Sequence, residues 1–581
     1  MIRVLARLLV AGIFLSGFAW AQEDDSNDAG EAGHGVARIS LLNGDVSVQR
    51  GDSGEVVAAA VNGPLVAGDQ VLTGPSARAE IQFDWANLVR LGTDTQIRLA
   101  SLENNQFQVQ LARGTVTLSV IRDSSGQVEV DTPNMAFRPR ERGMYRISVT
   151  DDGESEVTVR AGEGDTYTPH GTEAVQAGQT MMVRGPVSDP EFQIVQAIPM
   201  DDWDRWNQQR DQRLLSTRSY QYASPDIAGA SDLDSYGRWV YVPPYGWVWS
   251  PGGVGPDWAP YRNGQWDWLD WYGWSWVSYD PWGWAPYHYG RWFYGAGFGW
   301  CWYPGPIYHH YYWRPALVAF FGFGYGGVGV GLGFGSVGWV PLGPHELFHP
   351  WYGRGRYVND VRLTNVTNIR STYINARVAN GISGVGAGAF GQGGRPGALR
   401  LNGQERISAI RGGVPVTPTS AGMRMTNRSA RIAPAPSVRT QFYSPRSALA
   451  AQRGPAPAVR GWRQVPNQSA GQAGRSQGAN WRSFGQAPAG ASRPDGYRQP
   501  SSPDWRSFGQ ASQAPRTYQG NPAPRYTAPR SDGVRINPPI VRERTQSSGS
   551  ASHTNSGGHS SGGSAAHSGG GHSTGSSHSS K

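Results

Sequence analysis

Aromatic and polar residues alternate in three similar stretches near the middle of the chain. These stretches cover residues 236–251, 263–277 and 289–304. The first tryptophan of the stretch recurs after 27 residues and again after 26, and a Gly-Trp pair follows it in each copy. A fixed spacing in this range indicates a supersecondary unit that is repeated along the chain.

Each copy predicts a β-hairpin with an aromatic core. In the first copy, Trp239 and Tyr241 alternate with Arg238 and Val240, so both rings lie on one face of a strand. Residues 243–246, Pro-Pro-Tyr-Gly, suit the turn that follows. One hairpin alone is only marginally stable in water, so we expect the three to stack and bury a shared aromatic face. The tryptophans expected in this repeat core are Trp239, Trp247, Trp249, Trp266, Trp274, Trp276, Trp292, Trp300 and Trp302.

Residues 35–190 show shorter alternating segments. Val46–Val48, Ala79–Phe83 and Thr115–Val120 are examples, and Gly-Asp or Asp-Gly pairs separate such segments. Short strands with regular turn signals predict an all-β domain.

Two further segments complete the part expected to fold. Residues 200–223 have a helical period and acidic residues at their start, where the helix dipole favours them, so we predict a linking helix. Residues 316–340 carry no charge and are long enough to suggest a transmembrane span. Their alternate glycines disfavour a helix and instead predict strands with one apolar face. We therefore predict a Trp/Tyr/Gly/Pro-rich repeat domain over 236–352 and no membrane span after signal cleavage.

The N-terminus has the pattern of a secretory signal peptide. Two arginines precede the apolar run 8–18, and Ala19–Ala21 is a small-x-small cleavage site. The alternative, an uncleaved anchor, is disfavoured because the apolar run is too short to cross a bilayer. We expect a signal peptide over 1–21, an acidic flexible leader over 22–34, and a periplasmic or extracellular protein.

The composition changes after residue 352. Residues 353–581 are rich in Pro, Gly, Ser, Gln and Arg and are predicted to form a disordered low-complexity tail. From Arg354 onward, 28 arginines and one lysine face six acidic residues, which gives this part a net charge of +23. Arginine binds phosphate and carboxylate groups, so an anionic envelope polymer is a candidate partner. Single-stranded nucleic acid would suit the same residues, but export argues against it. The other possibility is a tail that only keeps the protein soluble.

Catalytic and metal sites are poorly supported by the sequence. It contains no nucleophile motif and no phosphate-binding loop, and Cys301 is the only cysteine. Three acids among the aromatic residues could suggest a glycosidase pair, but their expected outward positions favour a solubilising role. They are Asp267, Asp270 and Asp280. His309 and His310 could bind a metal with His288, but neighbouring side chains on a strand point to opposite faces. We expect no catalytic, cofactor-binding or metal-binding residues, no cofactor, and no enzymatic activity.

The connectors between the hairpins also repeat. A Trp-Ala-Pro-Tyr segment occurs twice and contributes Trp258, Tyr261, Trp284 and Tyr287. Flat aromatic faces stack on the apolar faces of sugar rings, so these four residues are the candidate ligand platform. The alternative is that all the rings form the core of repeats that lack aliphatic residues.

Four segments of the first β-rich region resemble the FecR domain. They are Gly44–Val48, Gly68–Gly74, Ala77–Phe83 and Val89–Leu91, and the resemblance covers residues 37–125. It implies a β-rich periplasmic module built as an irregular roll or solenoid. FecR regulators carry an anti-sigma segment and a transmembrane helix before this domain, whereas this chain has only the signal peptide. Signalling to a sigma factor is therefore a poor fit.

Residues 37–352 as a whole resemble an uncharacterised family of exported bacterial FecR-domain proteins. The shared features are the linking helix, the Gly-x-Trp hairpins, the connectors and the segment Gly338–Pro344. The resemblance implies a mainly β architecture and no known activity. The leading hypothesis is a non-enzymatic envelope protein that acts as a scaffold or binding module and contacts a glycan or polyanion through its repeats and tail. The alternative is a periplasmic FecR-like sensor that binds a ligand and relays to a membrane protein.

Overall fold

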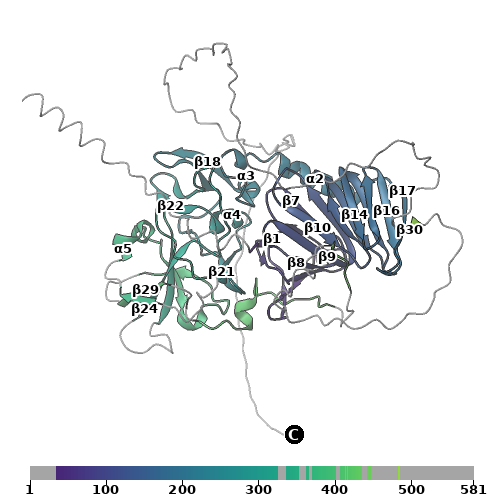
Figure 1. The fold of residues 1–581 in the computed structure, drawn as a ribbon. Helices are drawn as coiled ribbons and strands as arrows, with labels where there is room; N and C mark the ends of the chain where they lie inside the picture. The colour runs from purple at the N-terminus through teal and green to yellow at the C-terminus, as the bar shows by residue number, and fades with distance from the viewer. Residues whose placement is uncertain are drawn as a thin grey trace, which may run out of the picture. The chain divides into compact units, whose positions relative to one another are not determined.

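The structure is a computed structural model that describes residues 34–324, 335–352, 362–365, 369–400, 406–411, 414, 416–434, 441–445 and 482–483. The predicted signal peptide and most of the predicted leader and tail lie outside these residues. The described part confirms a mainly β fold with one long helix (Figure 1).

The N-terminal β domain consists of two sheets that share one long strand, β9 (Gln106–Val120). The first sheet has the order β4 (Pro64–Leu65), β1 (Ala37–Asn43), β6 (Arg78–Gln82), β7 (Asn87–Leu91), β9, β12 (Gly143–Val149), β13 (Ser155–Ala161), β16 (Gln179–Arg184) and β17 (Glu191–Gln196), with β30 (Arg482–Ser483) at its edge. The second has the order β3 (Val56–Ala58), β2 (Val46–Gln49), β5 (Gln70–Thr73), β8 (Gln96–Ser101), β9, β10 (Gln127–Asp131), β11 (Ala136–Pro139), β14 (Glu163–Thr168) and β15 (Gly171–Gln176). Buried aliphatic residues from both sheets form its core.

Strand β9 passes from one sheet to the other at Gly114. Its first half pairs with β8 and, in parallel, with β10, and its second half pairs with β7 and β12. Gly114 has a φ of +86°, and a Cβ there would lie 2.5 Å from Oγ1 of Thr95. Glycine is the residue that allows this conformation and this close approach.

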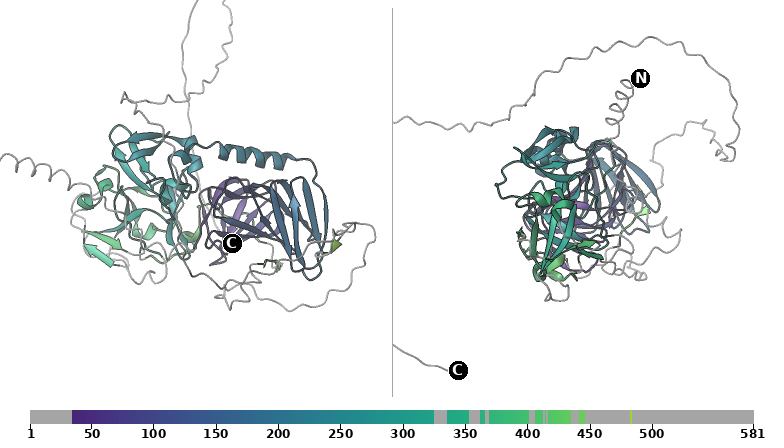
Figure 2. Two further views of the ribbon diagram at one scale, coloured as in Figure 1. Left: turned by 45° about the horizontal axis from the view of Figure 1, so that its top comes forward. Right: turned by 90° about the vertical axis from the view of Figure 1, so that its left-hand side faces the viewer.

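The predicted linking helix is α2 (Asp202–Leu215), and it packs across the first sheet (Figure 2). A capping box between Asp201 and Asp204 begins the helix. Beneath it, Arg90 of β7 contacts both Glu80 of β6, at 2.7 Å, and Asp211 of the helix, at 2.6 Å. Burial opposes the ionisation of Glu80, but Arg90 and the helix residue Arg210 outweigh it and lower the pKa of Glu80. This buried ionic network fixes the helix on the sheet.

The aromatic repeats form three hairpins with the same register. They are β18 (Gly237–Val242) with β19 (Gly246–Pro251), β20 (Gly264–Leu269) with β21 (Gly273–Ser278), and β22 (Arg291–Gly295) with β23 (Gly299–Tyr303). The first and third hairpins share a four-stranded sheet through the pair Trp249 and Trp302, while the second forms its own two-stranded sheet. Short helices also occur at α3 (Leu233–Tyr236), α4 (Trp284–His288), α5 (Ile369–Thr372), η2 (Ser219–Gln221), η3 (Ala230–Asp232), η5 (Ile374–Arg377), η6 (Ala387–Ala389) and η7 (Ser420–Met423).

The charge-free segment contributes two strands, while residues 325–334, which hold most of its alternate glycines, lie outside the described residues. β24 (Val318–Gly324) and β25 (Ser336–Pro341) pair with each other in a six-stranded sheet. The other strands of this sheet are β26 (Arg362–Asn365), β27 (Ser383–Gly386), β28 (Gly397–Ala398) and β29 (Arg406–Arg411). In the part of the chain described here, no helix is both long and apolar enough to cross a membrane.

Some described residues of the segment predicted as a disordered tail pack against the preceding domains. Beyond the strands just named, Phe390 is buried among the tryptophans and Met425 is buried in the core of the β domain. Arg431 lies 3.2 Å from Asp45, and Ser444 donates a hydrogen bond of 2.7 Å to Glu129. Composition alone suggests disorder here, but the segment packs because the other domains already offer aromatic and acidic surfaces to it.

The β domain and the aromatic domain share buried contacts. Arg38 of β1 forms an ion pair with Asp232 and lies over the ring of Trp284. Asn62 donates a hydrogen bond of 2.8 Å to the backbone oxygen of Asp280, and the hydroxyl of Tyr272 donates one of 2.8 Å to the backbone oxygen of His34. These side-chain contacts join the two domains.

A candidate binding groove in the aromatic domain

Most of the nine tryptophans expected in the repeat core are buried. Those with a buried side chain are Trp249, Trp266, Trp274, Trp276, Trp292, Trp300 and Trp302. Trp239 is half-buried against the same cluster. Trp247 differs from the expectation, because its side chain is 44% exposed at the tip of the first hairpin, where it contacts Tyr222 and Tyr241.

Three of the four residues expected to form a ligand platform are buried, which corrects that expectation. The hydroxyl of Tyr261 donates to the backbone oxygen of Tyr287 at 2.7 Å and accepts from the backbone N–H of Leu317 at 3.0 Å. The hydroxyl of Tyr287 donates a hydrogen bond of 2.8 Å to Asp280. The side chain of Trp284 is buried. The polar tips of the connector tyrosines thus find partners inside the protein, which allows their burial. Of the four, Trp258 is half-buried and lines a surface cavity.

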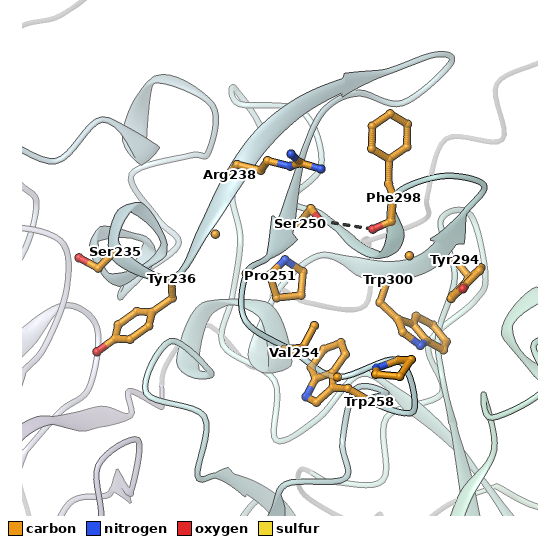
Figure 3. Close-up of a pocket in the computed structure, with 15 residues that line it drawn as sticks. Ser235, Tyr236, Arg238, Ser250, Pro251, Val254, Trp258, Tyr294, Phe298 and Trp300 are labelled. Carbon is orange, nitrogen blue, oxygen red and sulfur yellow. Dashed lines mark hydrogen bonds between the residues drawn. The ribbon is translucent and has the colours of Figure 1, made fainter. Parts of the chain in front are cut away.

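This cavity is an open groove of about 700 Å³ between the first and third hairpins (Figure 3). The groove lies beside the point at which β19 and β23 pair through Trp249 and Trp302. Its aromatic lining residues are Tyr236, Trp258, Tyr294, Phe298 and Trp300. Tyr294 is 53% exposed and Phe298 is 42% exposed, so both offer ring faces to solvent.

The polar side of the groove is small and carries one charge. Arg238 is the only charged residue among the described residues that line the groove. Ser250 is its partner across the strand pair and donates a hydrogen bond of 3.5 Å to the backbone oxygen of Phe298. Figure 3 shows Arg238 and Phe298 at one end of the groove, and Trp258 and Trp300 at the other. The groove can therefore stack on flat apolar faces and bind one anionic group.

Most residues that line the groove could not be identified as binding residues from the sequence. Arg238 and Tyr236 belong to a Tyr-Gly-Arg-Trp motif that recurs at Tyr289–Trp292. This motif occurs in the two hairpins that share a sheet, but only the three-dimensional pairing of these hairpins shows that a groove lies between them.

The three acids discussed as a glycosidase pair do not all lie on the surface, contrary to expectation. Asp270 is exposed, but Asp267 and Asp280 are buried. Burial raises the pKa of Asp267 to about 7, although Arg50 of the β domain opposes this effect. Asp280 accepts hydrogen bonds from Asn263 at 2.9 Å and from the Tyr287 hydroxyl. These two carboxyl groups take part in internal packing.

The histidines considered as metal ligands lie in different surroundings. His288 is buried, with Nδ1 2.7 Å from the backbone oxygen of Arg314, and burial lowers its pKa to about 3. His310 is exposed beside Asp226. Among the described residues, no group of three or more His, Cys, Asp or Glu side chains could hold a metal ion.

Two family models match the chain. The model described as "FecR protein" matches residues 69–163, which span β5 to the start of β14 in the N-terminal β domain. The chain is a FecR-domain protein. The model described as "Family of unknown function (DUF6600)" matches residues 230–346, which contain the whole groove. The FecR-domain protein thus contains two regions that match different family models.

The similarity of the chain to solved structures is low. Two crystal structures of a proposed anti-sigma factor from Parabacteroides distasonis, at 2.50 Å and 1.65 Å, are similar to the FecR-domain protein at 16% and 15% identity. Their TM-scores are 0.19 and 0.20, and each likeness covers 22% of this chain and 59% of the other. No curated protein matches the chain.

Proposed function

We propose that this FecR-domain protein is a non-enzymatic binding protein of the cell envelope and that its groove holds a chain of sugar residues. The observation that carries the proposal is the groove between the first and third hairpins, with its aromatic walls. Protein sites for small ligands combine apolar and aromatic walls with a few polar groups, and volumes of about 300–1,000 Å³ are typical. The groove of about 700 Å³ falls in this range.

An extended polymer suits the groove better than a compact apolar ligand. The exposed rings of Tyr294 and Phe298 stand on one wall, and Trp258 stands at the end away from Arg238. Glycines at 237, 252, 255 and 299 leave parts of the lining without side chains. A saccharide presents flat C–H faces to such rings and hydroxyl groups to solvent and to the polar side.

The rest of the fold supports the groove as a rigid surface. The hairpins that form it are fixed by the buried tryptophan core. That core is joined to the N-terminal β domain and the residue just before it through Arg38, Asn62 and Tyr272. In this proposal the FecR domain is a scaffold in the exported protein, and the DUF6600 region contacts the ligand.

Affinity electrophoresis of the purified full chain in gels that contain soluble polysaccharides tests the proposal. We expect retardation by at least one polysaccharide. Trp258→Ala should weaken binding about two- to tenfold, because an aromatic stacking contact contributes about 0.5–1.5 kcal/mol. Trp247→Ala is the matched control, since it removes an exposed tryptophan that does not line the groove. If the gels retard both variants equally, the groove is not the binding site.

A second candidate function is suggested by the FecR match at residues 69–163. In that function the chain is an envelope sensor that binds a ligand and relays its presence to a membrane protein. Crosslinking of the full chain in intact cells, followed by purification, should then recover one membrane protein in a stable ratio. Recovery of glycan without such a partner would favour the binding function alone.

A further inference from the structure

We infer that the groove selects an acidic polysaccharide and that Arg238 binds the carboxylate of a uronic acid residue. This inference rests on the proposed function, because it names the class of sugar that the same groove holds. It adds a specificity-determining residue that the sequence analysis did not consider.

The first support is the charge of the groove. Arg238 has an exposed side chain, and none of the described residues that line the groove is acidic. No ion pair joins Arg238 to an acid within the described part of the chain, whereas Arg38, Arg50 and Arg90 are all paired with carboxylates. A guanidinium that is not neutralised favours an anionic ligand, and its planar donors match a carboxylate.

The second support is the position of this charge relative to the rings. Arg238 lies at the end of the groove near Ser250 and Phe298, while Trp258 and Trp300 lie at the other end (Figure 3). A pyranose ring that stacks by its face directs an equatorial carboxylate sideways, in the plane of the ring. A sugar seated on the aromatic wall can thus extend its carboxylate along the groove towards the guanidinium.

The same geometry distinguishes the groove from a general polyanion site. The arginine-rich sequence from residue 354 onward can attract any polyanion by charge alone. The groove requires both a flat sugar face and an acid at a defined distance from it. Nucleic acid and sulfated polymers therefore serve as comparison ligands.

The test compares two forms of one polymer that differ only in charge. Isothermal titration with polygalacturonate and with its fully methyl-esterified form keeps the backbone constant and removes the carboxylate charge. We expect the full chain to bind the acid about tenfold or more tightly than the ester, since a charge-assisted hydrogen bond contributes about 1.5–3 kcal/mol. Arg238→Gln should reduce this preference about tenfold, to the part that the basic tail supplies, and leave binding to the ester unchanged.

Controls separate the groove from the basic tail. Arg142→Gln removes an exposed arginine of the FecR domain and should keep the preference. Arg238→Lys should restore part of it, and dextran sulfate should show the same affinity for wild type and Arg238→Gln. Equal binding of acid and ester by the wild type, or a preference in Arg238→Gln as large as that of the wild type, overturns the inference while the proposed function stands. If neither these two polymers nor any neutral polysaccharide binds, the proposed function itself fails.

Discussion

Replacing Trp274 by alanine tests how the aromatic repeats hold together. Trp274 is fully buried in the second hairpin, with ring centroids of Phe390 at 5.1 Å and Trp268 at 5.4 Å. A Cβ on Gly391 would lie only 2.1 Å from the Trp274 ring, so the backbone of that residue rests directly on it. The side chain therefore connects the second hairpin to a segment more than 100 residues further along the chain.

The expected cost follows from this burial. Burying an aromatic side chain removes about 150–250 Å² from water, which at about 25 cal/mol per Å² corresponds to about 4–6 kcal/mol. Measured truncations of large core aromatics cost about 3–5 kcal/mol. The indole N–H of Trp274 has no hydrogen-bond partner among the described residues, so its removal also relieves a desolvation penalty. We therefore expect a loss near the lower end, about 3 kcal/mol.

The repeat itself supplies the control variant. Trp247 occupies the equivalent Gly-Trp position in the first hairpin but is largely exposed, so Trp247→Ala should cost less than about 1 kcal/mol. Urea unfolding followed by far-UV circular dichroism gives the free energy of unfolding for both variants. If Trp274→Ala is as stable as Trp247→Ala, the shared aromatic core is refuted.

Three further predictions concern the junctions of the fold. Gly391→Ala should lower the melting temperature, because its Cβ meets Trp274 and its φ is +67°, whereas Gly388→Ala, with open space around it, should not; equal melting temperatures would contradict the packing. Limited proteolysis should leave a core that reaches about residue 434, because Met425 is buried in the FecR domain, and a core that ends near residue 352 would show that this segment is not docked. Asp267 has its pKa raised from 3.8 to about 7, so the stability that it contributes is present below pH 4 and is lost as the pH rises through about 7. Asp267→Asn should remove up to about 3 kcal/mol of this pH dependence in urea unfolding between pH 5 and pH 8, since the raised pKa lies about two pH units above pH 5, and an unchanged dependence would assign it to other groups.

The hairpins and their faces could be predicted from the sequence because local alternation determines them. Trp239 and Trp249, or Trp266 and Trp276, are separated by a short turn, so their register depends on nearby residues alone. Which hairpins pair with each other is different. The three copies have almost the same pattern, and the pairing of Trp249 with Trp302 depends on connectors whose burial local sequence does not show.

The segment after residue 352 shows a second limit of sequence reasoning. Its composition is too polar and too rich in glycine for a core of its own. It packs because Trp274 and the FecR domain provide the apolar surface, and Gly391 and Gly422 let the backbone approach the ring closely. The composition of the segment alone predicts disorder because it contains no information about the apolar surface on the rest of the protein.

The candidate site was only partly predictable for the same reason. The repeated connectors drew attention to Trp258, which does line the groove, but also to Tyr261 and Tyr287, whose hydroxyl groups have partners inside the protein. Arg238 carries no local signal of a binding role. Its place in the groove follows from the pairing of the first and third hairpins.

Hydroxyl-radical footprinting of the full chain, with and without a bound polysaccharide, tests the central claim most directly. With the binding polymer at saturation, we predict strong protection of Tyr294 and Phe298, the exposed rings of the groove, and unchanged labelling of Tyr241 and Trp247 on the first hairpin. Protection confined to Tyr241 and Trp247, or no change at Tyr294 and Phe298 when binding is saturated, would contradict the assignment of the groove as the binding site.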